Sequence, residues 1–68
     1  MRHTVVISKE TGLVRNEYYS VPPSINNHVK RSINNEIVDC FEFCFQSGAK
    51  AWYSNKHYYY EFRDGFAL

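Results

Sequence analysis

Residues 24–48 read SINNHVKRSINNEIVDCFEFCFQSG, and they decide the fold class because they contain the one helix that the sequence predicts. Placed at the roughly 100° intervals of a helix, their main apolar side chains fall within a third of the circumference. These side chains are Ile25, Val29, Ile33, Ile37, Cys40, Phe43 and Cys44. The echo of Ser-Ile-Asn-Asn at 24–27 and 32–35 spans about two helical turns. With Ser24 as N-cap and Gly48 as the stop, the pattern predicts one amphipathic helix.

The segments on either side of residues 24–48 are β-branched or aromatic and are predicted to be strands. On the N-terminal side, His3–Ser8 and Leu13–Val21 are joined by a turn that contains Gly12, and Pro22-Pro23 ends the pairing. On the C-terminal side, Ala49–Ser54 and His57–Arg63 are expected to form a hairpin with Asn55-Lys56 at its turn.

The predicted fold class is therefore α+β. The element order β-β-α-β-β gives a four-stranded antiparallel sheet with one helix packed across one face. Residues 1–68 are expected to form a single domain, with Phe66-Ala67-Leu68 folding back as a short apolar anchor.

Aromatic side chains are concentrated toward the end of the chain, around Trp52, Tyr53 and the run Tyr58-Tyr59-Tyr60. Successive side chains of a strand point to opposite faces. The last strand therefore offers an aromatic set, which we expect to face the core beneath the helix, and a mixed set, which we expect to face solvent or a partner. The first set is Tyr58, Tyr60 and Phe62, and the second is His57, Tyr59, Glu61 and Arg63.

The net charge of +1 gives no uniform field that could hold a polyanion, which disfavours generic DNA coating. No apolar run has the roughly 18 residues of a membrane span, and the polar start MRHTVVISKE does not resemble a signal peptide. We therefore expect a cytoplasmic protein with no membrane association. The abundance of Ile, Asn, Lys, Tyr and Phe follows from A+T-rich codons and suggests a bacteriophage origin, in which case the location would be the host cytoplasm.

No catalytic, cofactor or metal signature is found, so the sequence predicts a protein that is not an enzyme. Cys40 and Cys44 lie on the predicted core face and are expected to be free, mostly buried thiols. The histidines are dispersed and do not complete a zinc motif with them. Asp39 and Glu42 are interpreted as a solvated face, and each glycine stands alone at a turn.

The charges of the predicted helix suggest a possible dimer. Lys30 and Arg31 lie toward its N-terminal end and Asp39 and Glu42 toward its C-terminal end, opposite to the order that the helix macrodipole favours. Two antiparallel helices of a homodimer could pair these ends, although a plain solvated face is the preferred explanation of the charges. Val38, Phe41 and Phe45 form a second apolar ridge, which either sits deeper in the core or lines a partner groove.

Tyrosine and tryptophan are enriched at interface cores, so the sequence predicts a small protein-binding module. Size and composition suggest a phage-encoded inhibitor that evades host defence by sterically blocking a host protein complex. The candidates are a CRISPR effector (an anti-CRISPR role), a restriction or toxin component, or RNA polymerase. The alternative is a single-stranded nucleic-acid-binding module that uses the same aromatics. The predicted partner-binding residues are Tyr18, Trp52, Tyr53, Tyr59 and Arg63, with the charged residues Lys30, Arg31, Asp39 and Glu42.

Overall fold

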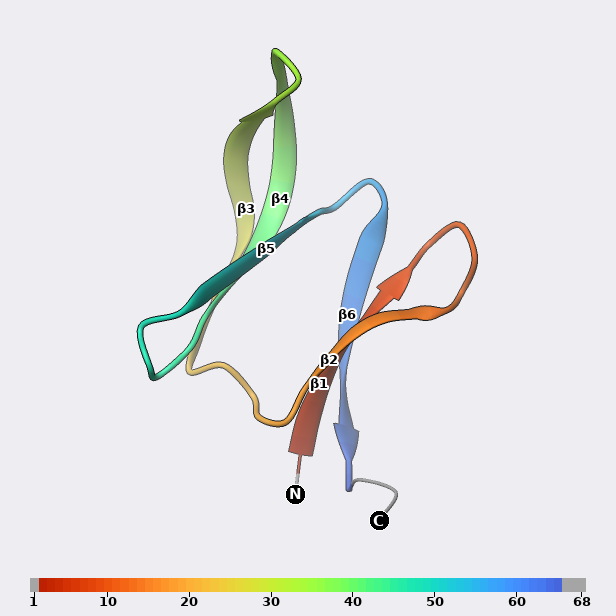
Figure 1. Cartoon of the computed structure of the whole chain (residues 1–68), viewed down its shortest axis with the longest axis vertical. Coiled ribbons are helices and arrows are strands. Elements are labelled where there is room, and N and C mark those ends of the chain that lie inside the picture. Colours follow the sequence, from red (N-terminus) through yellow and green to blue (C-terminus); the bar gives the residue numbers. More distant parts are fainter. Residues whose placement is uncertain (1, 66–68) are drawn as a thin grey trace. The chain divides into compact units, whose positions relative to one another are not determined.

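The computed structural model describes residues 2–65, and every helix or strand within them is a β-strand (Figure 1). The strands are β1 (Arg2–Ser8), β2 (Val14–Tyr18), β3 (Ser24–Ile33), β4 (Glu36–Cys44), β5 (Lys50–Ser54) and β6 (Tyr58–Asp64). They form two antiparallel three-stranded sheets, ordered β2-β1-β6 and β3-β4-β5. The prediction of an α+β class with one four-stranded sheet under a helix is therefore wrong.

The predicted helix is replaced by the hairpin of β3 and β4, which reverses at Asn34-Asn35. Both asparagines have positive φ, 51° and 66°, as the two central residues of a type I′ turn require. Asparagine reaches this left-handed region more readily than other non-glycine residues, and the right-handed twist of the turn matches that of the strands. The β-branched residues beside the turn, Ile33 and Ile37, also favour strands. The helical spacing of the apolar residues was thus coincidental.

The echo of Ser-Ile-Asn-Asn also has a different meaning from the one predicted. Its second copy ends in the Asn34-Asn35 turn, whereas its first copy leads into an irregularity of β3, where the register with β4 shifts between Asn26 and Val29. The two asparagine pairs therefore mark positions where strand geometry is interrupted. The residues between them form strand β3 and not the two helical turns that were predicted.

The described residues divide into two compact units. Unit 1 holds the described parts of 1–21 and 57–68, and unit 2 is the continuous segment 22–56. The single domain expected for residues 1–68 stays a prediction.

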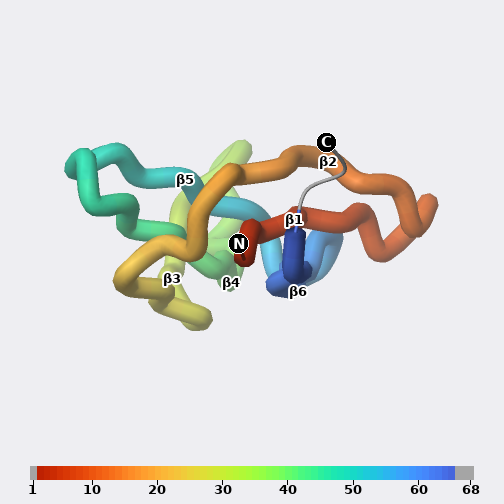
Figure 2. Tube along the Cα trace, turned by 90° about the horizontal axis from the view of Figure 1, so that it is seen from below, coloured from red at the N-terminus to blue at the C-terminus, as the bar shows by residue number. Residues whose placement is uncertain are grey.

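In unit 1, β1 is the central strand, with β2 and β6 on its two sides (Figure 2). Its middle residues Val5, Val6 and Ile7 are buried, as expected of the strand with two neighbours. β6 pairs with β1 without interruption from Arg2 opposite Asp64 to Ser8 opposite Tyr58. β1 and β6 thus join the two sequence ends of the described chain.

In unit 2, β4 is central and supplies the buried residues Cys40, Phe41 and Phe43. The rings of Phe41 and Phe43 lie 5.4 Å apart between centroids, and Tyr53 of β5 stacks on Phe41 at 5.6 Å. The phenylalanines of the predicted helix are therefore central to the core of this sheet.

β5 pairs with β4 only from Cys40 to Cys44, so the hairpin of β3 and β4 continues beyond β5 as a two-stranded arm. The arm comprises residues 30–39 and is visible at the top of Figure 1. Ile37 on the arm is 72% exposed.

The four predicted strands are confirmed within a few residues at their ends, but the predicted hairpin at Asn55-Lys56 is wrong. β5 pairs with β4, and β6 pairs with β1, so these two strands belong to different sheets. The alternation predicted for β6 is confirmed in exposure, because Tyr58, Tyr60 and Phe62 are less exposed than their neighbours, but the helix that they were expected to face does not exist within the described residues. The apolar anchor proposed for residues 66–68 lies outside the described residues.

Candidate functional site

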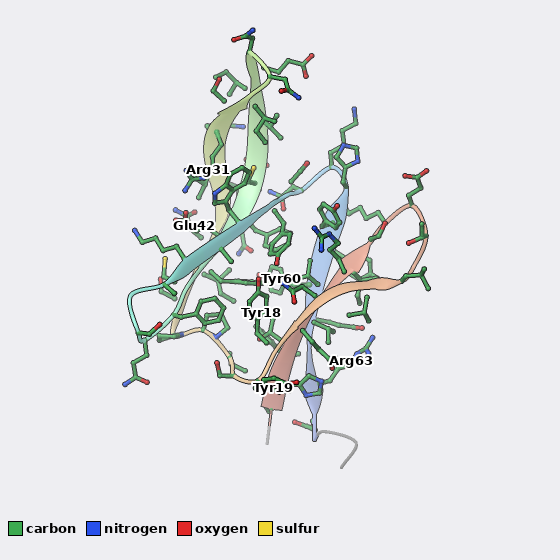
Figure 3. All side chains as sticks on the ribbon, viewed as in Figure 1. Tyr18, Tyr19, Arg31, Glu42, Tyr60 and Arg63 are labelled. Carbon is green, nitrogen blue, oxygen red and sulfur yellow. The ribbon has the colours of Figure 1, made fainter. Side chains whose placement is uncertain are left out.

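Three predicted partner-binding residues meet on one face of the unit 2 sheet. The guanidinium carbon of Arg31 lies 5.0 Å from the ring centroid of Trp52, within cation–π range. The Nη2 atom of Arg31 donates to Oε2 of Glu42, and Figure 3 shows these two side chains on the hairpin of β3 and β4. We call these residues, Arg31, Glu42 and Trp52, the Trp52 cluster.

The strand registers explain why this cluster forms. Glu42 pairs with Trp52 across β4 and β5, so their side chains share a face. Arg31 pairs with Val38, whose side chain is on the same face because it is four residues from Glu42 along β4. The Arg31 side chain therefore extends along the sheet, past Cys40, to reach the carboxylate.

The members of the cluster differ in exposure. The Glu42 side chain is only 11% exposed and that of Arg31 is 36% exposed, whereas Trp52 as a residue is 42% exposed. A carboxylate that is largely withdrawn from water is stable when it accepts a charged hydrogen bond. Glu42 thus fixes the guanidinium, the guanidinium fixes one side of the indole, and much of the indole remains open to a partner.

A second cluster surrounds Asp39 on the opposite face of unit 2. Asp39 Oδ2 lies 3.1 Å from Nδ1 of His28 and accepts a 3.1 Å hydrogen bond from Nδ2 of Asn55, while Nζ of Lys30 lies 3.4 Å from Oδ1. The same Asn55 amide donates to the carbonyl of Asn27 in the irregular part of β3. Asp39 thereby links β3, β4 and Asn55, the residue that follows β5.

The contacts with His28 and Asn55 hold the pKa of the Asp39 carboxyl below its ordinary value of 3.8. The pKa of the Cys40 thiol, on the Trp52 face, is shifted in the other direction. Burial raises it above its ordinary value of 9.0. Cys40 and Cys44 are both free thiols, as predicted, and Cys44 is partly exposed. A raised pKa does not favour a nucleophilic cysteine.

The charged residues predicted to act between two helices therefore pair within one hairpin. Lys30 contacts Asp39 and Arg31 contacts Glu42, because β3 and β4 are antiparallel neighbours. The argument from the helix macrodipole is wrong because the described residues contain no helix. The proposed pairing of two helices in a homodimer is wrong for the same reason.

In unit 1, Tyr59 and Arg63 are exposed residues of β6, as predicted. Tyr59 is 43% exposed and lies in a row with Ile7 of β1 and Val14 of β2, which is 46% exposed. Arg63 is held by Glu61 two residues earlier on the same face, with Nη2 2.6 Å from Oε1. Figure 3 shows Arg63 on β6.

Among the predicted aromatic partner residues, Tyr18 and Tyr53 are less exposed than Trp52 and Tyr59. Tyr18 pairs with Thr4 on the face that also carries Tyr60, and both tyrosines are labelled in Figure 3. Tyr53 packs on Phe41 and is partly buried. Both have defined contacts in their own units, so they are weaker candidates than Trp52 and Tyr59.

Among residues 2–65 there is no group of three or more His, Cys, Asp or Glu side chains placed to hold a metal ion. The same part of the chain contains no helix long and apolar enough to cross a membrane. The chain matches no protein-family model, no curated protein and no solved structure in the comparisons made.

Sequence reasoning named all three residues of the Trp52 cluster but did not connect them. It missed the roles of His28 and Asn55 at Asp39 and the row that joins Val14 to Tyr59. The useful signal was Asn34-Asn35, because a hairpin centred there places Arg31 opposite Val38 and Lys30 opposite Asp39.

Proposed function

We propose that this chain is a non-enzymatic protein-binding module whose main contact surface is the Trp52 cluster. The observation that carries this proposal is that Trp52 is 42% exposed as a residue, yet its indole lies against the guanidinium of Arg31. Tryptophan and arginine dominate binding energy at protein interfaces, and a side chain that is already ordered loses less entropy on binding.

The pairing of four of the eight basic residues makes the nucleic-acid alternative less well supported. Arg2, Lys30, Arg31 and Arg63 each lie against a carboxylate, at Asp64, Asp39, Glu42 and Glu61 respectively. Binding to a phosphate backbone depends on cations that displace counterions, and cations neutralised within the protein contribute little to it. Phage origin and the blocking of a host complex stay predictions from size and composition, and protein binding by Trp52 does not depend on them.

The test is affinity capture from bacterial lysate with wild type, Trp52→Ala and Tyr59→Ala, each with and without nuclease. Tyr59→Ala is the matched control, since it truncates an aromatic side chain of nearly equal exposure in the other unit. We expect one or more proteins to be retained by wild type and Tyr59→Ala and lost with Trp52→Ala, with nuclease having no effect.

Three results would count against this function. One is capture that disappears on nuclease treatment, which would favour nucleic acid. Another is loss of the partner with Tyr59→Ala and not with Trp52→Ala, which would move the contact surface to unit 1. The third is the absence of any protein retained by the wild type. Circular dichroism of both variants establishes that each remains folded.

A further inference from the structure

The surroundings of Trp52 carry a local charge pattern that narrows the class of partner. Lys50 precedes Trp52 by two residues on β5 and pairs with Cys44, so it lies on the same face. Two residues of a strand span roughly 7 Å, which places the Lys50 backbone close to the indole. Trp52 is therefore flanked by two basic residues, Lys50 along its own strand and Arg31 across the sheet.

The two cations differ in how far they are neutralised. Arg31 meets Glu42, whereas Lys50 is exposed and has no carboxylate partner within residues 2–65. The face around Trp52 thus holds two positive charges and one largely buried negative charge, an excess of one positive charge. The only other acidic residue paired on this face, Glu36, lies at the tip of the arm opposite Ile33.

Arg31 also retains unused hydrogen-bonding capacity. Its Nη2 atom donates to Glu42, but within the described residues its buried Nε atom has no acceptor. A guanidinium has five N–H donors and matches carboxylates in shape. A partner carboxylate that approached the exposed part of Arg31 would accept from a group that is already positioned.

We infer that the Trp52 cluster, extended by Lys50, binds an acidic peptide segment in which an apolar side chain is flanked by carboxylates. The apolar side chain packs on the open part of the Trp52 indole, and the carboxylates lie near Lys50 and the free edge of Arg31. Charge complementarity of this kind selects partners and accelerates association. This inference rests on the proposed function, since it assigns the partner class of the same surface.

The test uses fluorescence titration, because Trp52 is the one tryptophan of the chain and reports directly on its own surface. The probes are a synthetic peptide Gly-Asp-Glu-Phe-Asp-Glu-Gly, the same peptide with lysine in place of each acid, and a single-stranded oligothymidylate. The variants are Lys50→Glu and, as matched control, Lys56→Glu, which reverses an exposed lysine outside the paired strands.

We expect saturable binding of the acidic peptide, with no comparable binding of the basic one. Lys50→Glu should weaken it roughly tenfold, since an attraction between exposed charges is replaced by a repulsion. Lys56→Glu should leave the affinity within about twofold of wild type. Salt at about 1 M, where the screening length is about 3 Å, should remove most of the preference for the acidic probe.

The inference is overturned if the basic peptide binds as well as the acidic one, if the oligothymidylate binds more tightly than either, or if no peptide binds. If Lys50→Glu and Lys56→Glu lower the affinity for the acidic peptide equally, the peptide responds to the overall charge of the protein and not to the surface around Trp52. That result would also overturn the inference. Failure here is distinct from failure of the proposed function. A partner captured through Trp52, yet unaffected by Lys50→Glu, would leave protein binding intact and remove only the acidic class.

Discussion

Replacing Asn34 and Asn35 with alanine tests the reversal of the β3–β4 hairpin most directly. Both asparagines have positive φ, and an L-residue held in the left-handed region loses about 1–2 kcal/mol. Asparagine is more tolerant of this region, so we expect each alanine to lower the free energy of unfolding by about 1 kcal/mol. The double variant should therefore lose about 2 kcal/mol, out of the roughly 3–5 kcal/mol expected for a domain of this size.

A helix across residues 24–48 would respond in the opposite direction. In the middle of a helix, alanine is more favourable than asparagine by up to about 0.7 kcal/mol per residue, so the same double variant would be more stable. The sign of the change therefore separates the two folds, independently of its size.

The assay is thermal unfolding followed by far-UV circular dichroism. For a domain of 60–100 residues, 1 kcal/mol shifts Tm by about 4–8 °C, so we expect the double variant to melt about 8–16 °C below wild type. The matched control is Asn35→Gly, which removes the same side chain but accepts positive φ at no steric cost. An unchanged or raised Tm in the double variant would refute the turn. A loss in Asn35→Gly equal to that of the single variant Asn35→Ala would show that the Asn35 side chain, rather than its positive φ, stabilises the turn.

Three further predictions follow from unit 2. Asp39→Asn should destabilise the protein at pH 7, and the difference from wild type in urea midpoint should shrink as the pH falls. The reason is that the folded pKa of Asp39 lies below its ordinary value of 3.8, so its contribution is complete above that value and lost as pH falls through the folded pKa. In native protein, a thiol reagent should modify Cys44 well before Cys40, whose thiol is buried and has a raised pKa, as read by mass spectrometry. Arg31→Ala should lower the unfolding free energy by about 1–3 kcal/mol, because it leaves the largely buried Glu42 without its charged donor.

Much of the secondary structure outside residues 24–48 could be predicted, because β-branched residues and turn glycines give short-range signals. The Gly12 turn is an example, since its φ of 73° is the one that the bulged loop was predicted to need. The alternation along β6 was also predictable, because it depends only on the period of a strand.

The centre of the chain was predicted wrongly because apolar residues at three- and four-residue spacing also occur in a hairpin whose two strands each alternate. Phe41, Phe43 and Phe45 follow a period of two, which indicates a strand, but a single period for the whole stretch obscured it. The turn residues Asn34 and Asn35 were visible in the sequence, and they decide between the two patterns.

The pairing of β6 with β1 could not be predicted from local signals, since it joins residues that are 62 positions apart at Arg2 and Asp64 and 50 apart at Ser8 and Tyr58. An adjacent strand is the more common neighbour, which is why β5 was expected to pair with β6. The Trp52 cluster depended on the same kind of information. Its residue types suggested binding, but only the register brings Arg31, from β3, to Trp52 of β5.

The arrangement of β1 between β2 and β6 has a consequence for the order of events during synthesis. Unit 2 is one continuous segment, so its three strands can pair as soon as residues 22–56 have left the ribosome. β1 emerges first and meets β2 early, yet the edge that accepts β6 stays open until residues 58–64 have been translated. β1, the first of these strands to be made, is thus among the last to have both edges paired, and its open edge is where premature association with another chain would begin.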